Sequence, residues 1–594
     1  MRFRSLHKWD VTDEMSGLIF FAQRMDELLF DYTLDSYKSM SLNAPYLCRE
    51  ALRLIKDVEE ELIEEGNLPH VLDELEWSIQ NDKLAKDLLD VDLDYYILKS
   101  KEDSLHEKRK RLEALSKTIG PSRYLWKCKE RLYEEIVAKN KKAINNLSAT
   151  FATTLINFGY SKTYIYTITK NFFFIGSEPR IDSCERVKDY FDNFDQKVHY
   201  YDAVFLVDPL VRTVSQSVKA FQIDVHDKLN EELEHLVMEH EFFADGEYEG
   251  YQYVQVKGIR AYDYQKARTM AERKIDNLSD LFSLFYHKNQ ISWRRDAIVR
   301  KLCCDSISTL ERPHKGPMEK GFDYKPAKAA KELNRLISSF ALKNQSSFQK
   351  FNRVADLHGI CISNDIVENQ LVNLWTAIET LVPSHVGSNK INGVINFILP
   401  FIVVSYIYRL VSRFVADMFI WDRRITRRFL DQVESSDGVS LYVKALNLLA
   451  LEENQQNRNE LYEALKDFHL LRFRAFSLHE ILSKPRKLQE VIEVHKTKVS
   501  WQVRRMYRTR NLIVHTGQTP TYLEALIENG HDYLDQIMEG IIEFSCGSYR
   551  TQSLEQVFEL AKIQRIRFDR HLKNLEHVDR DSIRFLCERG KKSV

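Results

Sequence analysis

The chain has 594 residues, more than one hydrophobic core usually supports, so its length predicts two to four domains. A composition of 44% hydrophobic and 29% charged residues excludes a disordered or collagen-like chain, and a formal net charge of −1 excludes a global positive field. Any nucleic-acid binding must therefore come from local basic clusters. Eight scattered cysteines without a C-x-x-C pair, and a charged N-terminal segment without an apolar run, favour a cytoplasmic location.

The first 177 residues are expected to form a helical N-terminal domain. Residues 51–65 place Leu52, Ile55, Val58 and Leu62 on one helical stripe, with acidic residues opposite and Gly66 as the stop. Residues 131–158 continue the helical pattern.

Residues 178–325 are expected to form a small α+β domain. Residues 198–208 and 251–261 are β-branched and aromatic runs, and Gly258 is expected to mark a bulge in the second run. A long helix over 263–286 and a strand over 292–302 follow. This order favours a small sheet with helices on one face.

Residues 312–326, which are rich in proline and glycine, are the expected linker. A helical bundle over 326–550 and a helical extension over 551–594 come after it. Residues 391–408 (INGVINFILPFIVVSYIY) carry no charge, and eighteen residues is the lower limit for crossing a bilayer. Asn392, Asn396 and Pro400 interrupt the run, so we expect a helix buried in protein, with a membrane segment as the alternative.

An Arg-x4-His pattern occurs four times in the chain, and spacing alone cannot separate functional from accidental matches. Context favours the match at Arg510 and His515. Residues 496–517 form an amphipathic pattern that ends at Gly517, a residue suited to a left-handed helix cap. His515 is therefore expected in the last helical turn, with Asn511 one turn before it on the same face. The other matches have an apolar residue after the arginine.

The segment from Tyr507 to Gly517 (YRTRNLIVHTG) resembles the signature helix of HEPN domains, most closely the Apea-like branch found in anti-phage defence proteins. Residues 365–382, with their LWTAIETL stretch, resemble the first helix of that branch. The resemblance is clear over residues 365–545 and fainter over 250–345. It implies that residues 326–550 are a HEPN ribonuclease domain.

Arginine and histidine suffice for one kind of RNA cleavage. The RNA supplies the attacking 2′-OH, a histidine transfers protons, and an arginine fork matches the phosphate. We therefore expect a metal-independent endoribonuclease that leaves 2′,3′-cyclic phosphate ends, with Arg510, His515 and Asn511 as catalytic residues and neither metal nor cofactor. One histidine cannot be both base and acid in one step, so two copies are expected to face each other in a homodimer, as the resemblance also implies.

Further residues are expected to support the site. Glu379 is expected to orient Arg510 or His515. RNA is expected to contact two basic clusters with neighbouring aromatic rings, where the alternative is a solvated helix face. The expected RNA-binding residues are Arg504, Arg505, Tyr507, Arg508, Arg424, Arg427 and Arg428.

The resulting hypothesis is a cytoplasmic, toxin-like effector of antiviral abortive infection that cleaves RNA, with tRNA as one candidate substrate. Residues 1–330 would sense a phage-derived trigger or restrain the dimer, and a separate inhibitory partner is a further option. Two alternatives stay open. One is a non-catalytic HEPN-like module that binds RNA or protein, and the other is an effector that acts on membranes through residues 391–408.

Overall fold

The computed structural model describes residues 1–30, 37–38, 40–97, 103–177, 179–216, 218–227, 250–312, 316–319, 324–383, 390–434, 439–546 and 549–586. These residues form a mainly helical protein with one small antiparallel sheet, which confirms the fold class expected from the sequence. They group into two compact units. The larger comprises residues 1–153, 176–187 and 317–594, and the smaller comprises residues 154–175 and 188–316.

The border between the units at residues 316 and 317 falls inside the expected linker, although part of that linker and Cys587 lie outside the described residues. The expected division at 177/178, 325/326 and 550/551 stays a prediction. The structure adds that the N-terminal helices and the C-terminal helices share one unit.

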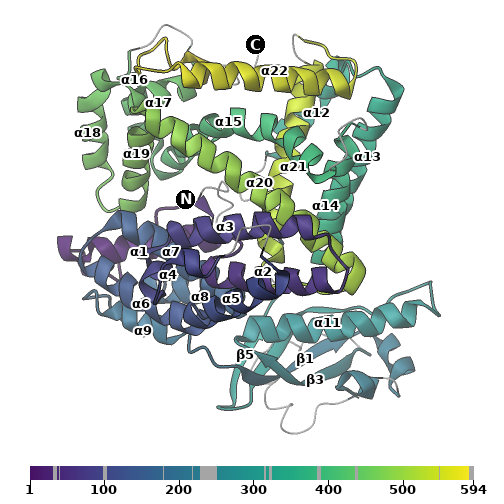
Figure 1. Ribbon diagram of the computed structural model, residues 1–594. Coiled ribbons are helices and arrows are strands. Elements are labelled where there is room, and N and C mark those ends of the chain that lie inside the picture. Colours follow the sequence, from purple (N-terminus) through teal and green to yellow (C-terminus); the bar gives the residue numbers. More distant parts are fainter. Residues whose placement is uncertain are drawn as a thin grey trace. The chain divides into compact units, whose positions relative to one another are not determined.

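The smaller unit is built around a five-stranded antiparallel sheet with the order β2-β3-β1-β4-β5. Helix α11 (Tyr264–Ser283) covers this sheet with its apolar residues (Figure 1). Helix α8 (Lys162–Phe173) belongs to the same unit, and α9 (Arg186–Asp192) crosses its border. The strands are β1 (His199–Val207), β2 (Ile223–His226), β3 (Gln252–Ala261), β4 (Trp293–Lys301) and β5 (Ser306–Leu310).

The sequence predicted β1, β3, β4 and α11, and it predicted the bulge at Gly258. Gly258 has a φ of +66°, and the register of β1 on β3 shifts between Tyr201 and Ala203. The Gly258 amide donates a hydrogen bond to Asp202 Oδ1 at 2.9 Å, which fixes the bulge. Strands β2 and β5 were missed because four or five residues are too few to display a clear alternation.

The N-terminal part of the larger unit is helical, as expected. Helix α2 ends at Glu59 rather than at residue 65, because Glu61 adopts a positive φ of 59° and Leu62 is 51% exposed. Residues 131–158 are helical as expected, and Lys139, with a φ of 58°, separates the two helices over which they extend. The helices are α1 (Ser16–Phe30), α2 (Ala44–Glu59), α3 (Leu68–Gln80), α4 (Lys83–Leu88), α5 (Leu105–Thr118), α6 (Pro121–Val137) and α7 (Lys141–Phe158), the last of which crosses into the smaller unit.

The C-terminal part of the larger unit is a bundle around the long helix α20 (Figure 1). Its helices are α12 (Pro326–Ser339), α13 (Gln345–Ser363), α14 (Val367–Leu381), α15 (Lys390–Trp421), α16 (Arg423–Asp431), α17 (Leu441–Ala450), α18 (Gln455–Ala464), α19 (His469–Leu482), α20 (Pro485–Thr516), α21 (Leu523–Cys546) and α22 (Leu554–Lys573).

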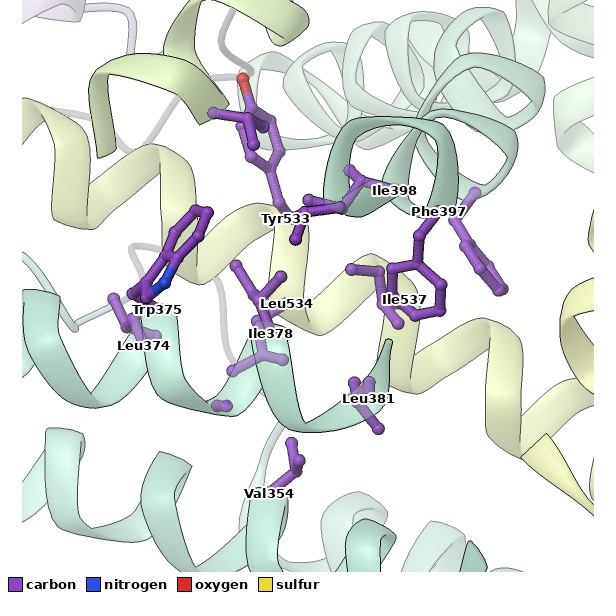
Figure 2. Close-up of a cluster of buried hydrophobic side chains, with 14 of the residues drawn as sticks. Val354, Leu374, Trp375, Ile378, Leu381, Phe397, Ile398, Tyr533, Leu534 and Ile537 are labelled. Atoms are coloured by element: carbon purple, nitrogen blue, oxygen red, sulfur yellow. The ribbon is translucent and has the colours of Figure 1, made fainter. Parts of the chain in front are cut away.

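A hydrophobic core joins α13, α14, α15, α20, α21 and α22. Figure 2 shows apolar side chains of α14 and α21 meeting those of α15 in this core. Trp375 and Tyr533 are its largest members and are at most 2% exposed. This core holds the segment that carries the Arg510–His515 motif, because Val499, Val503 and Met506 of α20 belong to it.

Helix α15 contains the uncharged run 391–408. Among the described residues it is the one helix whose length and composition would allow it to cross a membrane, yet 72% of its most apolar window is buried inside the protein. Asn392 accepts a hydrogen bond from Arg504 at 2.6 Å, and Ser405 donates one to Gln536 at 2.9 Å. The expectation of a helix buried in protein is therefore confirmed, although Asn396 is exposed.

The contact between α1 and α6 leaves no room for a side chain at Gly17. A Cβ atom there would overlap the carbonyl oxygen of Ile136, which is backbone and cannot move aside cheaply. Gly17→Ala should therefore lower the free energy of unfolding by about 1–3 kcal/mol or more. Gly359→Ala is the matched control, because this helical glycine faces open space and alanine should stabilise α13 by about 0.5–1 kcal/mol. Thermal melting of both variants checks the pair, and equal effects would contradict the packing argument.

Candidate functional site

The Arg510–His515 motif lies at the C-terminal end of α20, as the sequence predicts. Gly517 caps the helix in the left-handed conformation with a φ of 66°, and its amide donates to the Ile513 carbonyl oxygen at 2.9 Å. His515 is exposed in the last turn, beside Val514, which is 50% exposed. A histidine in this place can approach a large substrate without any movement of the core.

Arg510 and Asn511 are half-buried and touch each other. Arg510 Nη1 donates a hydrogen bond to Asn511 Oδ1 at 3.1 Å. Arg510 Nε is buried, and among the described residues it has no hydrogen-bond partner. Among the described residues, the guanidinium is thus held by one neutral contact and has no ion pair, so its positive charge is available to bind an anion.

The two arginines just upstream have a different environment. Arg505 is fully buried, and its Nη2 lies 2.6 Å from Glu74 Oε2 and 2.9 Å from Glu50 Oε2. Arg508, which is 7% exposed, pairs with Glu50 Oε1 at 2.9 Å. The sequence-based interpretation of these two as surface cations for RNA is therefore wrong, because each guanidinium is buried against a carboxylate of α2 or α3.

Burial and charge act in opposite directions on this cluster. Burial by itself raises the pKa of Glu50, but the charges of Arg505 and Arg508 outweigh it and lower that pKa to about 2. The pKa of Glu74 is raised, because burial there outweighs the attraction of Arg505. Glu50 is therefore ionised at neutral pH and compensates the buried arginines, and Glu74 provides a second contact to Arg505.

Arg504 and Tyr507, the other expected RNA contacts near the motif, are partly buried and engaged within the bundle. Arg504 donates to Asn392 of α15. The Tyr507 ring lies 5.4 Å from the ring of Trp375 in α14. Both side chains position α20 against its neighbours.

Glu379 was expected to orient the motif, but the geometry favours Glu368. Thr519, two residues past the Gly517 cap, donates to Glu368 Oε1 at 2.7 Å, while Trp375 meets Tyr507. Helix α14 therefore runs from the motif end of α20 toward its middle. Glu379 lies eleven residues beyond Glu368, about 16 Å further along α14. Sequence reasoning missed Glu368 because the direction of α14 relative to α20 is a tertiary property.

The expected basic cluster on α16 is on the surface, but far from the motif. Arg424, Arg427 and Arg428 are exposed, and the Arg428 guanidinium lies 4.8 Å from the Phe429 ring. Figure 1 shows α16 near the end of the unit where α20 begins, whereas the motif is where α20 finishes. A helix of 32 residues is about 48 Å long, so the structure does not bring this cluster and the motif together.

The discarded Arg-x4-His match at Arg474 and His479 is structural. Arg474 is 4% exposed and pairs with Glu27 at 2.9 Å, and His479 Nδ1 lies 2.8 Å from the Leu449 carbonyl oxygen. These two side chains have separate partners. The match that the sequence context discarded is therefore one whose two side chains are held by partners within the protein.

Three side chains elsewhere in the bundle could hold a metal ion. His358 Nε2 of α13 and His531 Nε2 of α21 are 3.1 Å apart, and each lies 3.4 Å from a carboxylate oxygen of Asp535. Sequence reasoning missed this group because His358 is 173 residues from His531 along the chain. The i, i+4 spacing of His531 and Asp535 on one helix was the available signal.

A cavity of about 400 Å³ lies along α20 before the motif. Its walls include Trp77 of α3 and Trp501 of α20, whose rings are 5.4 Å apart, and Lys498 Nζ is 5.3 Å from the Trp77 ring. Asn529 is 6% exposed, and its Oδ1 has no hydrogen-bond partner among the described residues. The cavity is a second place on α20 where polar and aromatic groups meet open space.

Comparisons of the chain with protein-family models, with curated proteins and with solved structures found no match.

Replacement of the Glu50 carboxylate tests the buried ion cluster. Glu50→Gln should destabilise the larger unit by about 3–5 kcal/mol at neutral pH, because Arg505 and Arg508 lose their shared partner. Glu59→Gln is the control, since Glu59 pairs with Arg109 on the surface and should contribute less than about 1 kcal/mol. Chemical denaturation measures both changes.

The same variant should alter the pH dependence of stability. The folded-state pKa of Glu50 is below its ordinary value of 4.5, so its contribution is fully present above pH 4.5 and is lost as pH falls through about 2. The stability difference between wild type and Glu50→Gln should shrink over that window. A difference that is constant with pH would contradict the pairing of Glu50 with the two arginines.

Proposed function

We propose that the protein is an endoribonuclease of the HEPN type, with Arg510, Asn511 and His515 as its catalytic group. The observation that carries this proposal is that the arginines of α20 lie in two different environments. Arg505 and Arg508 are neutralised inside the protein, whereas Arg510 has no acidic partner among the described residues and His515 is exposed at the capped end of the helix. A charge-bearing arginine, an amide and an exposed histidine in this order are suited to bind a phosphate and transfer a proton.

In the proposed reaction, a histidine takes the proton of the RNA 2′-OH, and the 2′-oxygen attacks the adjacent phosphorus. The 5′-oxygen leaves with a proton, so the products carry 2′,3′-cyclic phosphate and 5′-OH ends. Arg510 stabilises the additional negative charge on the phosphate, and Asn511 orients the Arg510 guanidinium. Both proton transfers involve histidine, which favours a site completed by His515 of a second copy.

We infer a homodimer in which the ends of two α20 helices approach each other. The exposed Val514 beside His515 supports this arrangement, because an apolar residue at the helix end gains from burial in an interface. The N-terminal helices of the same unit hold α20 through Glu50 and Glu74, so they can transmit a signal to the motif. We also propose that the protein is located in the cytoplasm and has RNA as its substrate. In this proposal it is an abortive-infection effector on which a trigger from an infecting phage acts.

Substitution of the motif tests the chemistry. Arg510→Ala and His515→Ala should each reduce RNA cleavage by about 10²-fold or more with unchanged thermal stability, because neither side chain belongs to the core. Asn511→Ala should reduce cleavage less, since an amide orients charge but transfers no proton at neutral pH. Gel analysis of labelled RNA, with circular dichroism of each variant, measures both properties.

The matched control is His479→Ala in the discarded match, which should leave cleavage intact. Cleavage should stop on RNA with 2′-O-methyl groups and persist in EDTA as long as the protein stays folded. Equal cleavage of DNA, or RNA binding without cleavage by the wild-type dimer, would refute the proposed reaction. The second outcome would instead favour a binding module.

The proposed dimer predicts a dependence on concentration. Specific activity should fall when the protein is diluted below its dimerisation constant, and Val514→Glu should weaken both association and cleavage because it adds a charge to the interface. Sedimentation measures association and the cleavage assay measures activity on the same samples. Full activity from a species that sediments strictly as a monomer would rule out the shared site.

A further inference from the structure

We propose that His358, His531 and Asp535 bind one Zn²⁺ ion between α13 and α21. This site goes beyond the proposed ribonuclease function, because none of its residues belongs to the Arg510–His515 motif. It was not expected from the sequence, which shows no metal-ligand spacing near that motif.

The distances within the group match the edges of a tetrahedral zinc site. Zinc binds histidine nitrogen and carboxylate oxygen at about 2.0–2.1 Å, so neighbouring ligand atoms in a tetrahedron lie about 3.3–3.4 Å apart. The His358 and His531 Nε2 atoms are 3.1 Å apart, His358 Nε2 is 3.4 Å from Asp535 Oδ1, and His531 Nε2 is 3.4 Å from Asp535 Oδ2. The two ring nitrogens and the Asp535 carboxylate thus lie close enough together to share one ion.

Each side chain of this group offers an atom that can bind a metal ion. In neutral imidazole a ring nitrogen either donates or accepts, so of two facing Nε2 atoms only one can donate to the other. The carboxylate of Asp535 is a further acceptor beside both rings. Two ring nitrogens and a carboxylate oxygen can each offer a lone pair, and a divalent cation can accept all three at once.

Burial divides the group into an anchored side and an open side. His531 is 4% exposed, while the His358 and Asp535 side chains are 29% and 20% exposed. An ion can therefore enter from solvent past His358 and Asp535. Three protein ligands leave a fourth tetrahedral position, which water can fill at the open side.

The ion would link two helices of the core that holds the motif. His358 belongs to α13, and His531 and Asp535 belong to α21. Gly530, next to His531, packs against Met506 of α20 so closely that a Cβ would lie 2.5 Å from the Met506 methyl carbon. Zinc at this place would stabilise the bundle directly beside the signature helix.

Metal analysis of the full chain tests the proposal. The protein is purified without a polyhistidine tag or chelator, and metal content is measured by plasma mass spectrometry. We expect about one zinc per chain, a lower Tm after EDTA treatment, and recovery of the Tm on addition of Zn²⁺. Replacement by Co²⁺ should give the visible absorption bands of a tetrahedral nitrogen and oxygen site.

Two variants locate the ion. Asp535→Asn keeps the shape of the side chain and removes the carboxylate charge, and His358→Gln removes a ligand at the open side without emptying the core. Both should lower zinc affinity at least about tenfold. His571→Gln is the matched control, because His571 is an exposed histidine on α22 of the same unit, and it should retain full zinc content.

Wild-type protein that neither contains zinc nor binds added Zn²⁺, or variants that bind it as tightly as the control, would overturn the proposal. Iron or manganese at these residues in place of zinc would also overturn it. All of these readouts are independent of RNA cleavage. They also show whether EDTA affects the fold, and so separate loss of a structural ion from loss of catalysis in the cleavage assay.

Discussion

The buried guanidinium of Arg505 is the constraint on which the larger unit depends. A fully buried positive charge is costly unless carboxylates meet it, and the carboxylates of Glu50 and Glu74 come from helices more than 400 residues earlier in the chain. The ion pairs of Arg505 with Glu50 and Glu74 therefore hold α2 and α3 against the middle of α20. Arg508 shares Glu50 and extends the same contact toward the motif.

Helical geometry explains why nearby arginines of one helix have different roles. Positions 505 and 508 are separated by three residues and lie about 60° apart around the axis, so both face α2. Position 510 is about 140° from position 505, which turns its side chain away from Glu50 and Glu74. The same rotation places Asn511 and His515 one turn apart on a single face. Structural and candidate catalytic cations can thus alternate along one helix without competing for the same acids.

The packing of α20, α14 and α21 connects the motif with the rest of the bundle. Tyr507 lies against Trp375, and Met506 lies against Gly530. The histidine and aspartate group between α13 and α21 is next to this contact. A dense interior transmits small displacements because it has no space to absorb them, so the conformation of the motif depends on how tightly these helices are held.

Local chemistry determined what the sequence could reveal by itself. The helical period, the Gly517 cap and the position of His515 in the last turn follow from neighbouring residues, and the structure confirms them. The strands β1, β3 and β4 and the bulge at Gly258 have the same origin. The identity of the motif as a distinct Arg-Asn-x3-His segment was also visible, because its context differs from that of the other matches.

Only the tertiary structure decided which charges are available to a ligand. The sequence around a basic side chain is the same whether that side chain lies on the surface or in a buried ion pair. Whether Arg505 and Arg508 are exposed or buried therefore depended on Glu50 and Glu74, whose positions no local pattern encodes. The direction of α14 placed Glu368, rather than Glu379, at the end of α20 that carries the motif, and the pairing of α13 with α21 brought His358 to His531. Contacts between residues distant in the chain arise from packing the whole core, and the free energy of that packing is not a property of any single segment.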